Sequence, residues 1–462
     1  MAWAEQAARS LTETFDGSFE AAGIAIAAAG IDVAGIDIAG PAHAETALHA
    51  SPADTPADGR FEIGSVTKTM TATLLALLAA EGTLALDDEI GRWLSAGDNG
   101  RITPRNLATH TSGLPRMAPN YRPADPDNFW AGFTPELAEE ALRQVTVAPG
   151  AARVYSNFGF QLLGLVLERA SGQDYATLVT DRLLGPLSMT CSGVGRAGGG
   201  TPLPGHAGGR EVRHWDRPLP GAGGVEATIG DLARYAEACL RPPPTPLGAA
   251  LRAAQEPQAP IEPGRAQALG WIVVDGQLRG HSGGTGGFSS CVITDGSQGR
   301  AIAVMISSRG YSDALTRAAR LALAGRDPGE TRLQPLGPEW DDRTREVVQA
   351  LLDGRTAEVH ARATPRFRGK TPLEDFDRAW SRRAGVAGPA GEVLVSCQRR
   401  SGLVTADVTI AFAQAPLAMR IAFLESGDIA GLRLLPQPEP ASRPEPASRP
   451  EPASQPEPGQ PG

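Results

Sequence analysis

Residues 61–82, FEIGSVTKTMTATLLALLAAEG, are the most informative segment of this 462-residue chain. Their apolar run predicts a helix that opens at Ser65, continues to about Glu81 and stops at Gly82. Ser65 and Lys68 lie three positions apart, so their side chains share one helical face. The helix N-terminus and burial both disfavour a cation, and a neutral Lys68 amine could activate the Ser65 hydroxyl. The Ser65 amide could then donate to an oxyanion.

The scarcity of lysine singles out Lys68. The chain has 43 basic residues, and only Lys68 and Lys370 among them are lysines. Arginine stays protonated at any usable pH, whereas a buried lysine can lose its proton and act as a base. The alternative is that one of two lysines lies three residues after a serine by chance.

Tyr155 and Asn157 form a second motif, in ARVYSNFGFQLLG at residues 152–164. A tyrosinate at position 155 beside Lys68 could relay protons. The Asn157 amide could orient a substrate amide or hold Lys68. The alternative is a packed tyrosine followed by a turn asparagine.

The third motif is HSGGTGG at residues 281–287, within LRGHSGGTGGFSSCVITDG. Strand-like runs flank it, and glycines on an edge strand let a substrate backbone approach closely. The Gly284 amide could supply a second oxyanion donor. The segment is not a phosphate-binding loop, because G-x-x-x-x-G-K is absent.

Together, S-x-x-K, Y-x-N and H-S-G-G resemble the serine penicillin-recognising superfamily of class C-like β-lactamases, D,D-peptidases and related esterases. The resemblance covers about residues 15–320 and includes LATHTSGLPR at 107–116 and GAGGVEATIGDLARYAEA at 221–238. It implies an antiparallel sheet flanked by helices, with a helical subdomain. It also implies that Ser65 accepts the acyl group, and that Lys68 and Tyr155 are general bases. The residues that it would assign to substrate positioning are Asn157, His281, Ser282 and Gly283.

His281 departs from the family pattern, in which K-T-G is more usual where a β-lactam or peptide carboxylate is held by lysine. Histidine is shorter and mostly neutral at pH 7, which argues against efficient β-lactam hydrolysis. The esterase, D-amino-acid amidase and peptide-cyclising branches fit better. Two other residues receive plainer interpretations: His110 structures its loop, and Trp215 packs.

These motifs predict a serine acyl hydrolase or acyltransferase of esterase or D-peptidase/amidase type, acting through a Ser65 acyl-enzyme on an ester, thioester or amide. A penicillin-binding-protein-type thioesterase, which releases and cyclises a nonribosomal peptide, is the first alternative. Its substrate would be a peptidyl thioester bound to a carrier protein. The further alternatives are a β-lactamase and a non-catalytic binding protein on this fold.

The chain is expected to be an α+β protein with several parts. Strand signals near both ends of residues 1–325 predict one sheet built from early and late segments, and the early stretch predicts two short strands around residues 24–38. Residues 326–339 are expected to form a linker. Two helices followed by strands predict a small cystatin-like or lipocalin-like α+β domain at 340–435. The PEPASR repeats at 436–462 predict an extended, disordered tail.

Composition excludes several classes of function. The formal net charge is −9, which is unlike a protein that binds nucleic acid or anionic membranes. No basic segment leads into an apolar one near residue 1, so we expect no signal peptide. The four cysteines are far apart, which favours free thiols and a cytoplasmic location. The histidines are scattered, and we expect neither a metal nor an organic cofactor.

Overall fold

The computed structural model divides the chain into two compact units, residues 1–332 and 333–462, and each has its own hydrophobic core. A strand expected near residues 32–38, most of the expected linker and the expected tail lie outside the described residues. The described residues are 2–15, 24–30, 45–51, 55–121, 123, 125, 128–150, 152–207, 210–328, 338–384, 390–400, 403–412 and 417–434.

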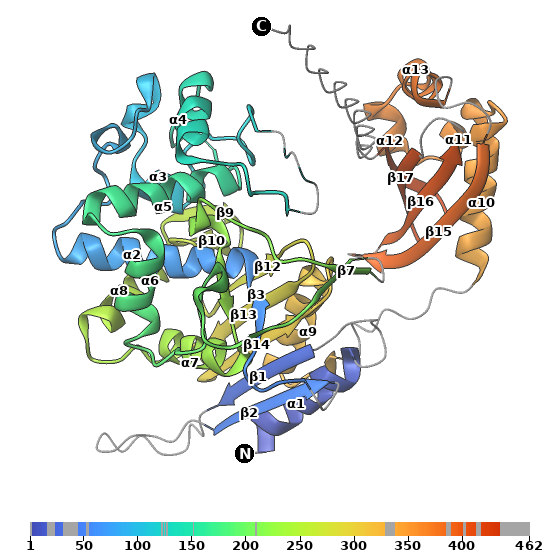
Figure 1. The fold of residues 1–462 in the computed structure, drawn as a ribbon. Helices are drawn as coiled ribbons and strands as arrows, with labels where there is room; N and C mark the ends of the chain where they lie inside the picture. Colours follow the sequence, from blue (N-terminus) through green and yellow to red (C-terminus); the bar gives the residue numbers. More distant parts are fainter. Residues whose placement is uncertain are drawn as a thin grey trace, which may run out of the picture. The chain divides into compact units, whose positions relative to one another are not determined.

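An eight-stranded antiparallel sheet forms the centre of the first unit, in the order β2-β1-β14-β13-β12-β11-β10-β9. β1 (Ile24–Gly30) pairs along its length with β14 (Arg300–Ile306), so segments from both ends of the unit lie side by side (Figure 1). This confirms the prediction of one sheet built from early and late residues. The other strands are β2 (Glu45–Ser51), β9 (Ala259–Glu262), β10 (Arg265–Gln267), β11 (Ile272–Val274), β12 (Leu278–Gly284) and β13 (Ser289–Asp295).

Both faces of this sheet are buried under helices. Side chains alternate between the two faces of β13 and β14. Val292 and Ala303 therefore belong to the larger core on one face, whereas Cys291 and Val304 belong to a smaller core on the other. The smaller core is completed by α1 (Ala2–Phe15) and α9 (Ser312–Leu323). The sheet is therefore a buried scaffold on which loops at its edges can be positioned.

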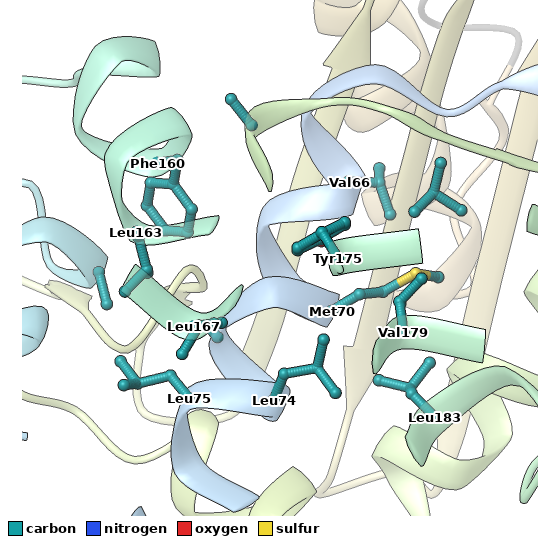
Figure 2. Packing of buried hydrophobic residues seen from close by; sticks show 14 of the residues in the cluster. Val66, Met70, Leu74, Leu75, Phe160, Leu163, Leu167, Tyr175, Val179 and Leu183 are labelled. Atoms are coloured by element: carbon teal, nitrogen blue, oxygen red, sulfur yellow. The ribbon is translucent and has the colours of Figure 1, made fainter. Parts of the chain in front are cut away.

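The segment that contains Lys68 forms the most deeply buried helix of the larger core. It begins with a 3-10 turn, η1 (Gly64–Val66), and continues as α2 (Thr67–Ala80), in agreement with the predicted helix. Every α2 residue from Thr67 to Leu78 is buried. Figure 2 shows the apolar neighbours of this helix, which include Phe160, Leu163, Leu167, Tyr175, Val179 and Leu183.

The remaining elements of the first unit surround α2 and the sheet. A mixed four-stranded sheet has the order β4-β8-β3-β5, and β6 and β7 form a hairpin. The four-stranded sheet consists of β3 (Gly59–Glu62), β4 (Gly193–Val194), β5 (Thr201–Pro202) and β8 (Val225–Ala227), and the hairpin of β6 (Gly205–Ala207) and β7 (Arg210–Val212). The helices are α3 (Pro104–Ala108), α4 (Pro135–Gln144), α5 (Asn157–Ser171), α6 (Tyr175–Val179), α7 (Ile229–Leu240) and α8 (Pro246–Ala254). The short helical turns are η2 (Ile90–Arg92), η3 (Gly97–Arg101), η5 (Thr180–Leu184), η6 (Gly195–Ala197) and η7 (Pro220–Ala222).

The second unit has helices first and strands after them, in the order that the sequence predicts. Four strands form an antiparallel meander, and Trp340, Trp380 and Phe423 contribute to the core that they share with the helices. The helices are α10 (Pro338–Leu352), α11 (Thr356–Ala361), α12 (Pro365–Lys370) and α13 (Leu373–Ala384). The strands are β15 (Ala390–Arg400), β16 (Leu403–Phe412), β17 (Leu417–Phe423) and β18 (Ile429–Leu434). Within the described ranges, neither unit has a helix of the length and apolarity that crossing a bilayer requires.

Candidate active site

Ser65 and Lys68 are in direct contact at the start of α2. The Lys68 Nζ lies 2.9 Å from the Ser65 Oγ and donates a second hydrogen bond of 2.6 Å to the Ala222 carbonyl. Lys68 is fully buried, whereas Ser65 is partly exposed and lines a cavity. A backbone carbonyl therefore holds the amine, and the role of Asn157 in holding Lys68 stays a prediction.

The surroundings of Lys68 favour its neutral form. Burial is the main reason why the pKa of Lys68 lies well below its ordinary value, because a buried ammonium loses its hydration. The positive charges of Arg217 and Arg116 lower the pKa further. A neutral amine can keep one N–H on the Ala222 carbonyl while its lone pair accepts the Ser65 proton.

The phenol of Tyr155 lies near both of these residues. The Lys68 Nζ is 5.2 Å from the centroid of the Tyr155 ring, and the Arg116 guanidinium is 5.1 Å from it. Burial raises the pKa of Tyr155, and its hydrogen bond to Ser65 and the charges of Arg116 and Arg153 offset this only in part. Burial therefore favours the phenol at rest, and the proton-relay role expected for Tyr155 stays a prediction.

His110 supports the segment that carries Tyr155. Its backbone is left-handed, with φ 60°, and its ring centroid lies 4.5 Å from that of Tyr155. The His110 Nδ1 accepts a hydrogen bond of 3.1 Å from the Ser156 amide, so the ring proton belongs on Nε2. Burial lowers the pKa of His110 well below its ordinary value, and nearby cations lower it further. The residue is a neutral support, in agreement with the loop-structuring role expected for it.

Glycines allow β12 to lie directly on the turn that carries Ser65. A Cβ at Gly64, where φ is 50°, would lie only 2.8 Å from the Gly284 nitrogen. A Cβ at Gly283 would overlap the Ile63 carbonyl oxygen. Ser65 and Gly284, whose amides are the two candidate oxyanion donors, therefore come from adjoining backbone segments and line the same cavity.

His281 and Ser282 line a second cavity, of about 280 Å³, to which Ser65 does not contribute. Tyr155 is in its wall as well. Burial lowers the pKa of His281 to about 3, and the charge of Lys68 lowers it further, so the imidazole is neutral. His281 therefore offers no cation to a substrate carboxylate.

The Ser65 cavity itself has a volume of about 450 Å³. Asn157 lines it, and the Asn157 Nδ2 contacts the Met117 Sδ at 3.7 Å. Asn157 therefore lies in the wall of the cavity that Ser65 lines, and its role in orienting a substrate amide stays a prediction.

Most of the wall of this cavity was not predicted from the sequence. Three arginines and three large aromatic residues line it, and Trp215, expected only to pack, is one of them. They come from three separate loops, and no spacing in the sequence links them. These residues are Arg116, Phe129, Trp130, Trp215, Arg217 and Arg309.

One group of side chains among the described residues has the spacing of metal ligands. It consists of Glu62, His214 and Glu226, whose ligand atoms lie within 4.8 Å of one another. Cations already accompany the carboxylates: an Arg60 nitrogen lies 3.6 Å from Glu226, and an Arg217 nitrogen lies 3.7 Å from Glu62. His214 also hydrogen-bonds Glu226 at 2.9 Å. A metal ion would face two guanidinium groups, so we interpret the group as a buried ion-pair network.

The part of the chain that carries this site is similar to known proteins. A family model described as Beta-lactamase matches residues 22–326. The D-alanyl-D-alanine-carboxypeptidase/endopeptidase AmpH of Escherichia coli (strain K12) is 32% identical over 198 residues, which are 40% of this chain and 49% of that protein. Protein flp of Staphylococcus aureus (strain N315) is 27% identical over 269 residues, which are 53% of this chain and 52% of that protein. The chain thus spans about half the length of these curated relatives.

Solved structures show the same fold. The D-alanine carboxypeptidase AmpC from Burkholderia cenocepacia matches with a TM-score of 0.56 and 23% identity, covering 69% of this chain and 97% of that chain. The match confirms the predicted arrangement of an antiparallel sheet flanked by helices.

Proposed function

Since the chain belongs to the beta-lactamase family, we propose that it is a serine acyl hydrolase or acyltransferase that forms an acyl-enzyme at Ser65. The proposed substrates are an ester, a thioester or an amide, of the kind that an esterase or a D-peptidase/amidase accepts. The observation that carries this proposal is the 2.9 Å contact between the Ser65 Oγ and the fully buried Lys68 amine. The carboxypeptidase names of AmpH and of the Burkholderia structure add support for peptide-like substrates.

Acylation begins when the Ser65 Oγ attacks the substrate carbonyl carbon and its proton passes to the neutral Lys68 amine. The carbonyl oxygen becomes an oxyanion, and the Ser65 and Gly284 amides donate hydrogen bonds to it. When the leaving group departs, it takes the proton of the Tyr155 phenol, and the Lys68 ammonium returns a proton to the Tyr155 oxygen. The step ends with acylated Ser65 and with Lys68 and Tyr155 in their starting forms.

Deacylation runs through the same groups in reverse. A water or an amine attacks the acyl carbon, and its proton passes through Tyr155 to Lys68. The Ser65 Oγ then departs from the tetrahedral intermediate and takes that proton back. Whether the product is an acid or an amide depends on which nucleophile reaches the acyl carbon.

A penicillin-binding-protein-type thioesterase that cyclises a peptide is the second candidate. The second cavity favours it, because Tyr155 and the neutral His281 both line that cavity. An acceptor amine held there would meet the Tyr155 phenol, which passes its own proton to Lys68 as it accepts the proton of the amine. The substrate would then be a peptidyl thioester bound to a carrier protein. β-Lactam hydrolysis ranks lower, because the third motif begins with the neutral His281 and has no lysine to hold the carboxylate.

Product mass spectrometry tests these proposals. The wild type and Ser65→Ala are incubated with a model peptidyl thioester that ends in a D-residue, and then with panels of esters and D-peptides. A linear acid whose formation requires Ser65 supports the hydrolase. A cyclic product that requires Ser65, and whose mass is lower than that of the linear acid by one water, supports the cyclase. If Ser65→Ala turns over every substrate as fast as the wild type, the proposed acyl-enzyme is wrong. The cytoplasmic location and the carrier-protein partner stay predictions.

A further inference from the structure

Arg217 is a largely buried cation in the wall of the Ser65 cavity, and its ion pair with Glu62 is not a hydrogen bond. Its side chain is 11% exposed, and its Nη2 has no hydrogen-bond partner among the described residues. The Glu62 Oε1 lies 3.7 Å away, beyond hydrogen-bond distance, and accepts instead from the Trp215 amide at 2.8 Å. Nη2 itself is fully buried, so it is the remaining exposed part of the Arg217 side chain that lines the cavity and can meet a ligand.

The Arg217 guanidinium lies close to the turn that carries the nucleophile. It occupies the space that a Cβ at Gly223 would need, and the same Cβ would lie 3.4 Å from the Gly64 carbonyl carbon. The guanidinium carbon is 5.0 Å from the centroid of the Trp215 ring. Because Gly223 has no side chain, the guanidinium can pack against the backbone that adjoins the Gly64–Ser65 turn. The Trp215 ring packs against the guanidinium from another side.

The rest of the cavity combines positive charge with apolar surface. Arg116 and Arg309 also line it, and Asp313 is the one carboxylate in its described lining. Phe129 and Trp130 provide apolar wall beside these charges. Such a lining suits a chain of methylene groups that ends in, or carries, a negative charge.

The two cavities indicate which part of the substrate lies beside Arg217. Ser65 and Gly284 line the Arg217 cavity, whereas Tyr155 lines the other one. In the proposed mechanism the leaving group needs the proton of Tyr155, so it departs on the Tyr155 side. The acyl chain then extends on the opposite side of the reacting carbon, into the cavity that contains Arg217.

We propose that Arg217 is a specificity-determining residue that binds a carboxylate on the acyl group of the substrate. The substrate class is then an ester, thioester or amide whose acyl chain carries a second carboxylate. This inference rests on the proposed acyl-enzyme at Ser65 and adds to it the identity of the acyl group.

Two N-acetylcysteamine thioesters that differ in one group test the inference. One carries an adipoyl chain, which ends in a carboxylate, and the other an adipamoyl chain, which ends in a neutral amide of nearly the same shape. The wild type should prefer the adipoyl thioester by about 10-fold to 100-fold in kcat/KM, as expected for a charge-assisted hydrogen bond in a partly buried site. The ratio cancels any effect of Arg217 on Lys68, because both thioesters use the same base and leaving group.

Variants identify the residue responsible. Arg217→Gln should bring the adipoyl preference close to one, and Arg217→Lys, which keeps the charge, should retain part of it. Arg213→Gln is the matched control, since Arg213 lies on the same segment and pairs with Asp125 at the surface. It should keep the wild-type preference. Thermal unfolding verifies that each variant is folded.

The wild-type measurement does not depend on any variant folding. Equal kcat/KM values for the two thioesters in the wild type, with turnover that requires Ser65, would overturn the inference and leave the proposed function intact. An adipoyl preference that survives unchanged in folded Arg217→Gln would overturn the role of Arg217. Turnover that does not require Ser65 would overturn the proposed function instead.

Discussion

Gly283 packs against Ile63 so closely that a side chain at position 283 would overlap the Ile63 carbonyl oxygen. The same oxygen accepts a hydrogen bond of 2.8 Å from the Ser290 hydroxyl of the neighbouring strand. This contact joins β12 to the residue that precedes the Gly64–Ser65 turn. The relative placement of the Ser65 and Gly284 amides thus depends on a position where only glycine fits.

Gly283→Ala should therefore impair catalysis more than substrate binding. The new methyl group would push β12 away from Ile63 and move the Gly284 amide out of line with Ser65. We expect kcat to fall at least tenfold with a smaller change in KM, and overpacking to destabilise the protein by about 1–3 kcal/mol. Steady-state kinetics and denaturant unfolding measure the two effects. Gly230→Ala, at the start of α7, is the control and should lower neither kcat nor stability. A Gly283→Ala enzyme with normal kcat would refute this account of the contact.

The acylation rate should rise with pH as Lys68 loses its proton. Burial first, and then Arg217 and Arg116, lower the pKa of Lys68, so the ascending limb should lie well below the ordinary lysine range. Arg116→Gln removes one cation, which raises the Lys68 pKa and shifts the limb to higher pH. Because Arg116 is exposed, the shift should stay below about one pH unit.

The pH profile of kcat/KM for an activated ester measures this limb. Arg213→Gln, which removes an exposed cation outside the cavity, should leave the profile in place. A shift of the Arg116→Gln limb to lower pH, or the same shift in both variants, would show that Lys68 is not the group that titrates.

His110→Asn should weaken the support of Tyr155. Asparagine tolerates the left-handed backbone of this position, but it removes the ring that packs on Tyr155 and the acceptor of the Ser156 amide. We expect a loss of about 1–3 kcal/mol in the free energy of unfolding, typical of a buried donor left unpaired, and a fall in kcat. His360→Asn, in the second unit, is the matched control for kinetics. Unchanged kcat in folded His110→Asn would remove His110 from the positioning of Tyr155.

The hydrogen bond between His214 and Glu226 should make stability depend on pH. Burial alone lowers the pKa of His214, but the hydrogen bond and the charge of Glu226, with the charge of Glu62, outweigh it and raise the pKa. The stabilisation from the charged imidazole is therefore present below the pKa of the unfolded chain and is lost as pH rises through the raised native pKa. Chemical denaturation of the wild type and His214→Gln should show a larger difference at pH 5.5 than at pH 8.5. Equal differences at the two values would argue against a charged His214.

The sequence predicted those parts of the site that depend on local spacing. Ser65 and Lys68 meet because they lie three residues apart at a helix start. Gly284, expected from the glycine-rich motif to be an oxyanion donor, lines the same cavity as Ser65, and its role as a donor stays a prediction. The Ala222 carbonyl, Trp215 and Arg217 could not be predicted, because they reach the site through loops whose path is set by tertiary packing. The raised pKa of Tyr155 could not be predicted for a similar reason, since burial is a property of the folded chain.

The fold was predictable where hydrophobic patterns were strong. The α2 helix and the helices-then-strands order of the second unit follow from periodicity alone. Strand signals near both ends of the first unit predicted that early and late segments share a sheet. The pairing of β1 with β14 and its register are known only from the structure.

Labelling of Ser65 is the most direct test of the central claim, that this residue is an acyl-accepting nucleophile activated by Lys68. Folded wild type, Ser65→Ala and Lys68→Arg are treated with a fluorophosphonate, and the modified residue is located by peptide mass spectrometry. The account predicts stoichiometric modification at Ser65 in the wild type, none in Ser65→Ala and much slower modification in Lys68→Arg. Modification at another residue, or equal rates in the wild type and Lys68→Arg, would contradict it.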